Sequence, residues 1–532
     1  MATTNHYDLI VLGDHVAGLV AAALVARRGK RVLVIPQGPI DGHYRLNRRP
    51  FALDPAPVLH ASCPAVRRVF EELGLWTQSR RELRPMAGMM HWALAGARLD
   101  EVLASTAGAG VASAVEGADG PRAWTESLAD EAAREWPGVP AASAWALRRQ
   151  WSDATDALFD ELLASDNALV ADGFWARRFL GRVASQLPPD NLDELEPLPA
   201  AHPLRAQARA LEPWVQHLAP AQLGKAASLR IAGLWGRPGG PLDRPGGVAS
   251  LREQLIQRIQ LKSGEVKPKL RVAEVLIKRG RVTGVSLLGK RDRYGCDHML
   301  IACDPRRLLD GALVPETLPK PLLVSLAAIH GAAYRYLLHL DLDARGLGPG
   351  LEGLTVCLPA SAGDYAAKAG VGTTYVRVGE SGRSELRPVA IVRVVGPSED
   401  PSELRERVLD DLEVRGVLPF ARPWIRLMHS PHDGRGATDG EGRALASLGS
   451  DTALSLPMDP LYAVDGAVPS LGVGLLPHSS GVKNLHFASR LTYPGLGLEG
   501  EFTAAWAAAG AVAQAGRSGL GRNLFLGRGN RG

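Results

Sequence analysis

The chain has 532 residues, of which 46% are hydrophobic and 22% are charged, and its formal net charge is +5. This composition excludes a chain that is disordered over most of its length, and no short repeat typical of collagen or coiled coils is sustained. The positive charge comes from scattered arginines rather than from one basic stripe, so we expect no nucleic-acid partner.

The cysteines and the apolar segments indicate where in the cell the protein is located. The chain has four cysteines, without a CxxC pair or the spacing of a zinc site, so we expect neither a disulfide framework nor a bound metal. Residues 1–7 lack the pattern of a signal peptide, and the longest apolar run, residues 16–26, is too short to span a bilayer. We therefore predict a cytoplasmic protein without a transmembrane segment.

The first forty residues predict a strand, a helix and a second strand. Residues 8–12 are an apolar run that ends at Gly13, and residues 31–35 are a second such run. Between them, residues 16–28 are rich in alanine and leucine and stop before Gly29, as a helix does. A strand, a glycine turn, a helix and a parallel strand form the opening unit of nucleotide-binding folds.

The middle of the chain contains two regions that differ in composition. Tryptophans among alanine, leucine and charged residues predict several short helices over 80–223. A Pro-Gly-Gly turn then precedes a helix that ends near residue 261. Apolar and β-branched runs predict strands at 270–277, 281–287, 298–302, 321–340 and 386–395, the first two as a hairpin.

The C-terminal part predicts fewer regular elements. Residues 430–443 are a glycine-rich loop, residues 484–488 a short strand, and residues 499–515 a helix. The tail, residues 516–532, is rich in glycine and arginine, and we expect it to be disordered.

The turn after the first strand reads Gly13-Asp-His-Val-Ala-Gly18. The dinucleotide fingerprint is G-x-G-x-x-G, in which the first glycine makes the turn, the second admits the pyrophosphate and the third lets helix and strand pack. Here the second glycine is replaced by His15, so the motif alone is weak evidence.

Three sequence blocks support the interpretation of this motif as a nucleotide-binding turn. The first contains Phe-Ala-Leu-Asp-Pro-Ala-Pro at 51–57 and Val-Phe-Glu-Glu-Leu-Gly-Leu at 69–75. The second runs from Arg-Pro-Gly-Gly at 244–247 to Ile-Ala-Cys-Asp-Pro at 301–305. The third, residues 485–500, ends in Thr-Tyr-Pro-Gly-Leu-Gly-Leu-Glu-Gly. In this order they resemble the nucleotide-binding segments of the phytoene desaturase and amine oxidase group of flavoproteins.

The resemblance implies an α/β fold with a split Rossmann-type FAD-binding domain and an inserted α+β substrate or cap domain. The FAD domain would be assembled from residues 1–75, 244–307 and 484–515, and the cap from a helical region at 76–243 and a β-sheet region at 308–483. The implied activity is that of an FAD-dependent oxidoreductase, which transfers hydride from an apolar or amine substrate to the flavin. No nucleophile and base are paired in the sequence, so it identifies no catalytic residue.

The resemblance also implies which residues lie along the FAD. They are Gly13, His15, Gly18, Gly42, Arg45, Val272, Arg490 and Gly497. In the family, the backbone at the position of Val272 holds the adenine.

Several of these positions depart from the family pattern. The acid that holds the ribose at the end of the second strand is replaced by Pro36, and a proline offers neither a carboxylate nor an N–H. The Gly-Gly pair of the family is Gly42-His43 here, and its closing Gly-Asp is Ser489-Arg490. The second fingerprint glycine is His15.

Two hypotheses account for these departures and stay open at the level of sequence. In one, the site has lost FAD, and the fold serves as a lipid- or protein-binding or scaffold protein. In the other, His15, Arg45 and Arg490 give positive charge to the pyrophosphate in place of close backbone approach. Peripheral membrane contact also stays open, because related desaturases take long apolar substrates from membranes.

Overall fold

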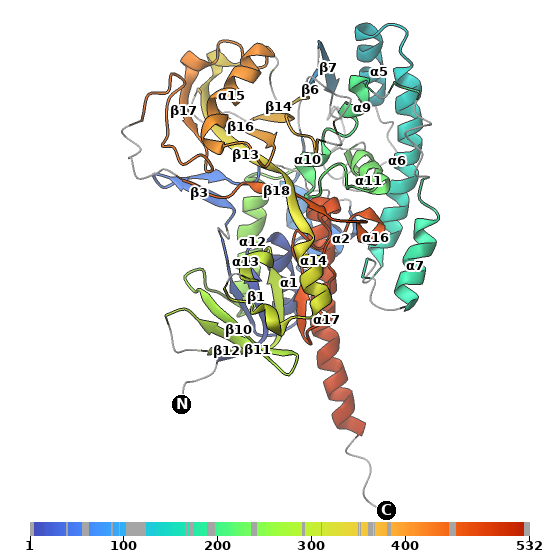
Figure 1. Cartoon of the computed structure of the whole chain (residues 1–532), viewed down its shortest axis with the longest axis vertical. Helices are drawn as coiled ribbons and strands as arrows, with labels where there is room; N and C mark the ends of the chain where they lie inside the picture. The colour runs from blue at the N-terminus through green and yellow to red at the C-terminus, as the bar shows by residue number, and fades with distance from the viewer. Residues whose placement is uncertain are drawn as a thin grey trace, which may run out of the picture.

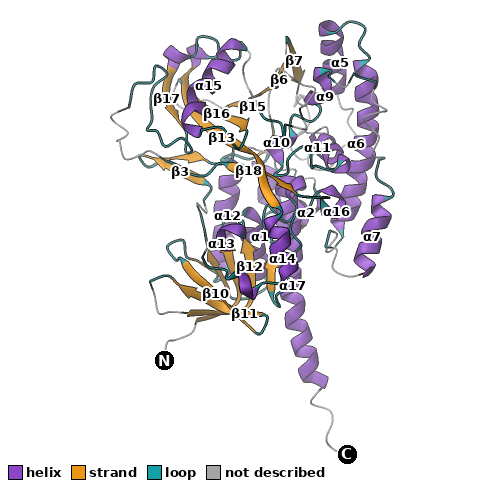
Figure 2. Ribbon diagram, in the orientation of Figure 1, coloured by secondary structure: helices purple, strands orange, loops and turns teal. Residues whose placement is uncertain are grey.

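The structure is a computed structural model. It describes residues 5–38, 41–55, 63–86, 89–94, 96–102, 124–165, 169–170, 174–188, 197–199, 201–235, 242–289, 293–309, 311–348, 351, 353–359, 365, 368–379, 385–445 and 454–525. Two sheets with helices packed on their faces form the body of the molecule (Figures 1 and 2).

The first sheet is built from segments that lie far apart in the sequence. Its strands are β1 (Asn5–Gly13), β2 (Val32–Ile35), β9 (Glu265–Val266), β10 (Val272–Lys278), β11 (Arg281–Leu287), β12 (Arg293–Ala302) and β19 (Leu485–Phe487). The strand order is β10-β11-β12-β1-β2-β9, and β19 also pairs with β12. The pairs among β9, β2, β1, β12 and β19 are parallel, whereas β10 and β11 form the expected antiparallel hairpin.

Helices cover this sheet. They are α1 (Val16–Arg27), α12 (Gly247–Leu261) and α17 (Gly497–Phe525), and α2 (Pro64–Glu72) packs against α17 and α1. Helix α1 contacts both α12 and α17 and is buried from Val16 to Ala26, which explains why its sequence is almost entirely alanine, valine and leucine. Its N-terminus follows the carboxyl end of β1, at the edge of the sheet where ligands of α/β proteins bind.

The second sheet is antiparallel apart from the parallel pair β14 and β6. Its strands are β6 (Met89–Leu94), β7 (Ala97–Val102), β13 (Ile329–Asp343), β14 (Gly353–Cys357), β15 (Thr374–Val378), β16 (Leu386–Val395), β17 (Ile425–His429) and β18 (Asp459–Val464). Helix α15 (Pro401–Val414) covers one face through Leu404, Val408 and Leu412. The other face packs against Trp214 and the neighbouring helical region.

The helical region lies beside the second sheet in Figure 1. Its helices are α3 (Trp76–Glu82), α5 (Trp124–Glu135), α6 (Ala141–Ala164), α7 (Phe174–Ala184), α9 (Pro203–Gln207), α10 (Glu212–Val215) and α11 (Lys225–Trp235). Shorter elements are β3 (His43–Leu46), β4 (Arg49–Ala52), β5 (Arg84–Pro85), β8 (Leu242–Asp243), α13 (Arg306–Leu309), α14 (Lys320–Ala327), α16 (Pro469–Gly472), η1 (Pro315–Thr317), η2 (Ala344–Gly346), η3 (Arg422–Trp424) and η6 (Pro494–Leu496).

The structure confirms the α/β fold class, with a Rossmann-type parallel sheet and a second, antiparallel sheet. Some element predictions were wrong. The stretch 80–223 holds β6 and β7 as well as helices, because β6 pairs with β14, a strand about 260 residues later in the chain. Residues 321–340 divide into α14 and the start of β13, since Leu322 and Leu326, one helical turn apart, pack into the core.

The end of the chain also differs from expectation. Helix α17 continues to Phe525, so residues 516–525 of the tail that we expected to be disordered are helical. Residues 526–532 lie outside the described part of the chain. In the described residues, no helix is both long and apolar enough to cross a bilayer.

Candidate functional site

A cavity of about 340 Å³ lies between the two sheets, and we call it the inter-sheet cavity. The first sheet contributes Asp14 and His15, which follow β1, and the second sheet contributes Asp459 at the start of β18. Arg252 of α12 and Arg490, which follows β19, are among its other charged lining residues. Residues from all three sequence blocks of the first sheet therefore meet at this cavity.

Gly13 and Gly18 flank the turn that carries His15 and are tightly packed. A Cβ placed on Gly13, which has φ +129, would lie 2.3 Å from the carbonyl of Ala302, and one placed on Gly18 would lie 2.3 Å from Ala302 Cβ. The amide of His15 donates to Ala302 O at 2.9 Å. The first and third fingerprint glycines thus let α1 and β1 pack closely on β12.

His15 fills the place of the second fingerprint glycine and is half-buried. Its Nδ1 accepts the backbone N–H of Arg490 at 3.2 Å, so the turn after β1 is tied to the segment after β19. Burial, together with the nearby guanidinium groups of Arg490 and Arg252, holds the pKa of His15 well below its ordinary value. The imidazole is therefore neutral at pH 7, and it does not supply the positive charge that the remodelled-site hypothesis expected of it.

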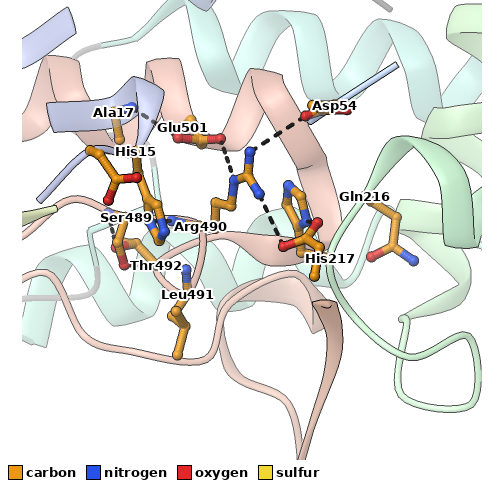
Figure 3. A network of polar contacts seen from close by, with 12 residues as sticks. His15, Ala17, Asp54, Gln216, His217, Ser489, Arg490, Leu491, Thr492 and Glu501 are labelled. Atoms are coloured by element: carbon orange, nitrogen blue, oxygen red, sulfur yellow. Dashed lines mark hydrogen bonds and ion pairs between the residues drawn. The ribbon is translucent and has the colours of Figure 1, made fainter. Parts of the chain in front are cut away.

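The N-terminus of α1 is bound by a carboxylate of the chain itself. Glu501 of α17 accepts the backbone N–H of Ala17, the second residue of α1, through Oε2 at 2.9 Å (Figure 3). The first amides of a helix have no partner within the helix, and the helix dipole favours an anion there. In Rossmann-type folds this is where the pyrophosphate lies.

Arg490 extends from Glu501 toward the second sheet. Its Nε lies 3.3 Å from Glu501 Oε1 and its Nη2 3.4 Å from Asp54 Oδ2 (Figure 3). Its Nη1 lies 3.0 Å from Asp459 Oδ1. Burial acts to lower the pKa of Arg490, but the surrounding carboxylates raise it above the ordinary arginine value. The guanidinium is therefore permanently charged and is already neutralised by acids of the chain.

Asp459 joins this network to the second sheet. Its Oδ2 lies 2.5 Å from Nη1 of Arg335 on β13 and 3.6 Å from Nδ1 of His217. Burial alone would raise the pKa of Asp459, but Arg490, His217 and Arg335 hold it well below its ordinary value. Asp459 is therefore ionised at neutral pH and links cations of both sheets.

The other end of the inter-sheet cavity lies beside the loop that follows β2. Position 36, after the last residue of β2, is the proline that offers no side-chain acceptor. Asp14 lies against this loop, since a Cβ placed on Gly38 would be 2.7 Å from Asp14 Oδ2. Arg252 is buried and donates to the carbonyl of Asp14, and its side chain packs on Gly42, where φ is +70.

The structure brings together some of the residues that the resemblance placed along the cofactor. His15, Gly42 and Arg490 line the inter-sheet cavity, whereas Gly13 and Gly18 pack on Ala302 beside His15. The others lie away from its lining. Arg45 on β3 is exposed and pairs with Asp41 at 2.6 Å, Val272 begins β10, and Gly497 begins α17 against the carbonyl of Val215.

Sequence reasoning missed the acids of this site and Arg252. Glu501 directly follows the closing glycine of the third block, so an acid at the start of the last helix was a visible signal. Asp54 lies in the motif at 51–57, but its pairing with Arg490 could not be foreseen, and Asp459 lies in no motif, because only the fold brings them to Arg490.

Comparison with known proteins identifies the fold. No family model matches the sequence, and no curated protein matches it. Among solved structures, wild-type putrescine oxidase bound to putrescine is 14% identical, with a TM-score of 0.56 over 96% of this chain and 100% of its own. Cyclohexylamine oxidase from Brevibacterium oxydans IH-35A is 16% identical, with a TM-score of 0.53 over 96% of this chain and 99% of its own.

A third similar structure is an oxidoreductase from Methanosarcina mazei, which is 14% identical, with a TM-score of 0.54 over 93% of this chain and 98% of its own. The chain therefore has the fold of FAD-dependent amine oxidases along almost its whole length, as the sequence blocks indicated. At this identity the likeness concerns the fold.

Proposed function

We propose that this chain uses the amine oxidase fold without FAD, as a binding protein whose ligand enters the inter-sheet cavity. The observation that carries this proposal is the hydrogen bond from Ala17 N–H to Glu501. It places a carboxylate of the chain where the fold otherwise receives the cofactor's pyrophosphate.

The residues around this bond do not fit a bound FAD. A pyrophosphate at α1 would lie beside the Glu501 carboxylate, and like charges at short distance in a buried site repel strongly. Arg490 could meet the phosphates only by giving up carboxylates that already neutralise it. The His15 side chain occupies the second fingerprint position, and Pro36 removes the acceptor for the ribose hydroxyls.

These losses act together on affinity. Each ordinary hydrogen bond contributes about 1 kcal/mol, which is roughly fivefold in Kd. The lost ribose and pyrophosphate contacts, together with the repulsion from Glu501, therefore lower FAD affinity by several orders of magnitude.

The inter-sheet cavity suits a small polar ligand. Its volume of about 340 Å³ lies near the lower end of the range of roughly 300–1,000 Å³ for small-molecule sites. Its walls carry Asp14, Asp304 and Asp459 as well as Arg252 and Arg307. Charges of both signs favour a polar ligand over the long apolar chain of a lipid, because an apolar chain would leave them without water or a partner.

Calorimetric titration with FAD tests the proposal. We expect no saturable binding to the wild-type chain, and a clear gain of affinity in the H15G/P36E/E501A variant, which restores the glycine and the ribose acid and frees the Ala17 amide. R45A is the control and should behave as wild type, because Arg45 is exposed and lies outside the cavity lining. Stoichiometric FAD binding by the wild type, or no gain in the variant, would overturn the proposal.

A further inference from the structure

Helix α7 exposes aromatic rings and arginines together on one surface. We call this surface the α7 face, and its residues are Phe174, Trp175, Arg177, Arg178, Phe179 and Arg182. Phe174 is 64% exposed, Trp175 76% and Phe179 45%, and the rings of Phe174 and Trp175 meet edge to face with 5.3 Å between their centroids. The other large apolar side chains that the described residues expose do not share a helix or strand with one another; they are Leu261, Leu288, Val324, Val414 and Phe420. Among the described residues, exposed apolar surface therefore gathers on α7.

The opposite side of α7 attaches the helix to the body of the molecule. Leu180 and Val183 are buried there and belong to the main hydrophobic core. Helix α7 itself runs along the outer edge of the helical region (Figure 1). A surface helix normally turns its large apolar residues inward, so packing within the described part of the chain does not explain three aromatic rings on the outer side.

The arginines of the α7 face are not neutralised. Arg177, Arg178 and Arg182 are exposed, and the helix contains no acidic residue. In the part of the chain that the structure describes, none of their guanidinium groups forms an ion pair or a hydrogen bond. Residues four apart lie on one row of a helix, so the row of Arg178 and Arg182 runs beside the row of Trp175 and Phe179. The aromatic rings therefore lie next to uncompensated positive charge.

We propose that the α7 face docks the protein on the surface of an anionic lipid bilayer, with its aromatic rings between the lipid headgroups and its arginines on their phosphates. Aromatic side chains prefer the interface between water and hydrocarbon, and the planar guanidinium of arginine binds phosphate. Helices that lie in this interface carry such rings together with basic residues. The contact is peripheral, since no helix among the described residues is both long and apolar enough to cross a bilayer.

Other occupants fit the α7 face less well. A second copy of the chain, packed through the same face, would bring its own arginines against these, and like charges repel. A stable protein interface takes roughly 20–30 residues a side, far more than the α7 face contains. Lipid headgroups, in contrast, adapt to one small convex surface. No residue of the α7 face lines the inter-sheet cavity, so this proposal does not depend on whether FAD binds.

Co-sedimentation of the full chain with lipid vesicles tests the docking. We expect binding to vesicles of phosphatidylglycerol and phosphatidylcholine in equal parts. Binding to phosphatidylcholine alone should be at least about tenfold weaker, because each arginine near an anionic surface contributes roughly fivefold in affinity. Added salt should weaken binding to the anionic vesicles. Equal binding to both kinds of vesicle, or binding to neither, would overturn the proposal, and the second result would favour an acidic protein as the occupant.

A pair of arginine variants separates the α7 face from the net charge of the chain. R178Q/R182Q should weaken binding to the anionic vesicles by about 25-fold. The matched control is R279Q/R281Q, which removes the same charge from exposed positions in the β10–β11 hairpin, on another side of the molecule (Figure 1). It should bind as the wild type does. Equal losses in the two variants would show attraction by net charge alone and would overturn the proposal.

The aromatic rings are tested in the same way. W175S/F179S should weaken binding to the anionic vesicles at least about tenfold, because two rings no longer leave water. V414S/F420S removes two exposed apolar side chains at and beyond the end of α15 and should bind as the wild type does. All these positions are exposed, so each variant should keep the far-ultraviolet circular dichroism of the wild type. Unchanged binding in a folded W175S/F179S variant would overturn the proposal.

Discussion

Arg490 departs from the family motif and also connects three carboxylates of the site. It stands where the family has an acidic residue, and its guanidinium is shared among Asp54, Asp459 and Glu501. Sequence comparison singled out the position, because Ser489-Arg490 departs from the expected Gly-Asp. The comparison could not assign its role, because its acidic partners come from distant segments that meet only in the folded chain.

Removing Arg490 should therefore destabilise the chain. R490M leaves the buried carboxylate of Glu501 without its cation, and losing one partner of a buried ion pair costs about 3–5 kcal/mol of unfolding free energy. The control is R45M, since the exposed pair of Arg45 and Asp41 contributes less than about 1 kcal/mol. Urea unfolding of both variants measures the difference. Equal, small losses would show that the Arg490 network contributes little to folding.

A second residue, His339, predicts how stability depends on pH. Burial lowers the pKa of His339 to about 4, even though its hydrogen bond with Ala52 O acts to raise it. The unfolded chain binds the proton more tightly, near pH 6.5, so the neutral histidine contributes stability above pH 6.5 that is lost as the pH falls toward 4. The loss is about 3 kcal/mol.

H339Q isolates this contribution, because glutamine can still donate to Ala52 O and does not titrate. Comparing urea unfolding at pH 7 and pH 4, we expect the variant to lose about 3 kcal/mol less than the wild type over the same interval. His486, whose pKa burial also lowers, to about 3, remains in both proteins and cancels in the comparison. The same loss in both proteins would contradict the assignment to His339.

At the scale of elements, local pattern predicted the first sheet well and the second sheet less well. Strand β11 has the predicted bounds, and α1 ends one residue earlier than predicted, because an apolar run, a glycine turn and an alanine-rich helix are local signals. Strands β6 and β7 were missed inside a stretch read as helical. Strand β6 pairs with β14 and β7 pairs with β6, and no local pattern encodes a partner as far along the chain as β14.

The packing of α1 on β12 leads to a prediction about two glycines. A Cβ on Gly18 would lie 2.3 Å from Ala302 Cβ, so G18A should force the helix outward and cost about 1–3 kcal/mol. G181A in α7 is the matched control: its Cβ would meet no atom within 4 Å, and alanine favours a helix over glycine by about 0.5–1 kcal/mol. Thermal unfolding should move in opposite directions for the two variants. A stabilised G18A would show that this contact is loose.

At the scale of the whole molecule, three sequence blocks build one Rossmann-type sheet, and the second sheet closes over its ligand-binding edge. This arrangement could be predicted, because the blocks keep the order found in the amine oxidase fold. Whether the site has lost FAD or been remodelled for it could not be predicted. The sequence is compatible with both hypotheses, a lost FAD site and a remodelled one. The choice between them depends on where Glu501 and Arg490 lie relative to α1. Glu501 is placed by the packing of α17 against α1, and Arg490 by the pairing of β19 with β12 and by the bond of its N–H to His15.

The visible absorbance spectrum of the full-length chain tests the central claim most directly. The protein is purified without added flavin, then incubated with excess FAD, desalted and measured again. We expect no flavin bands in either sample, because Glu501 holds the amide at the start of α1 and Arg490 is already neutralised. Flavin bands that correspond to one FAD per chain, in either sample, would contradict the claim that this fold works here without its cofactor.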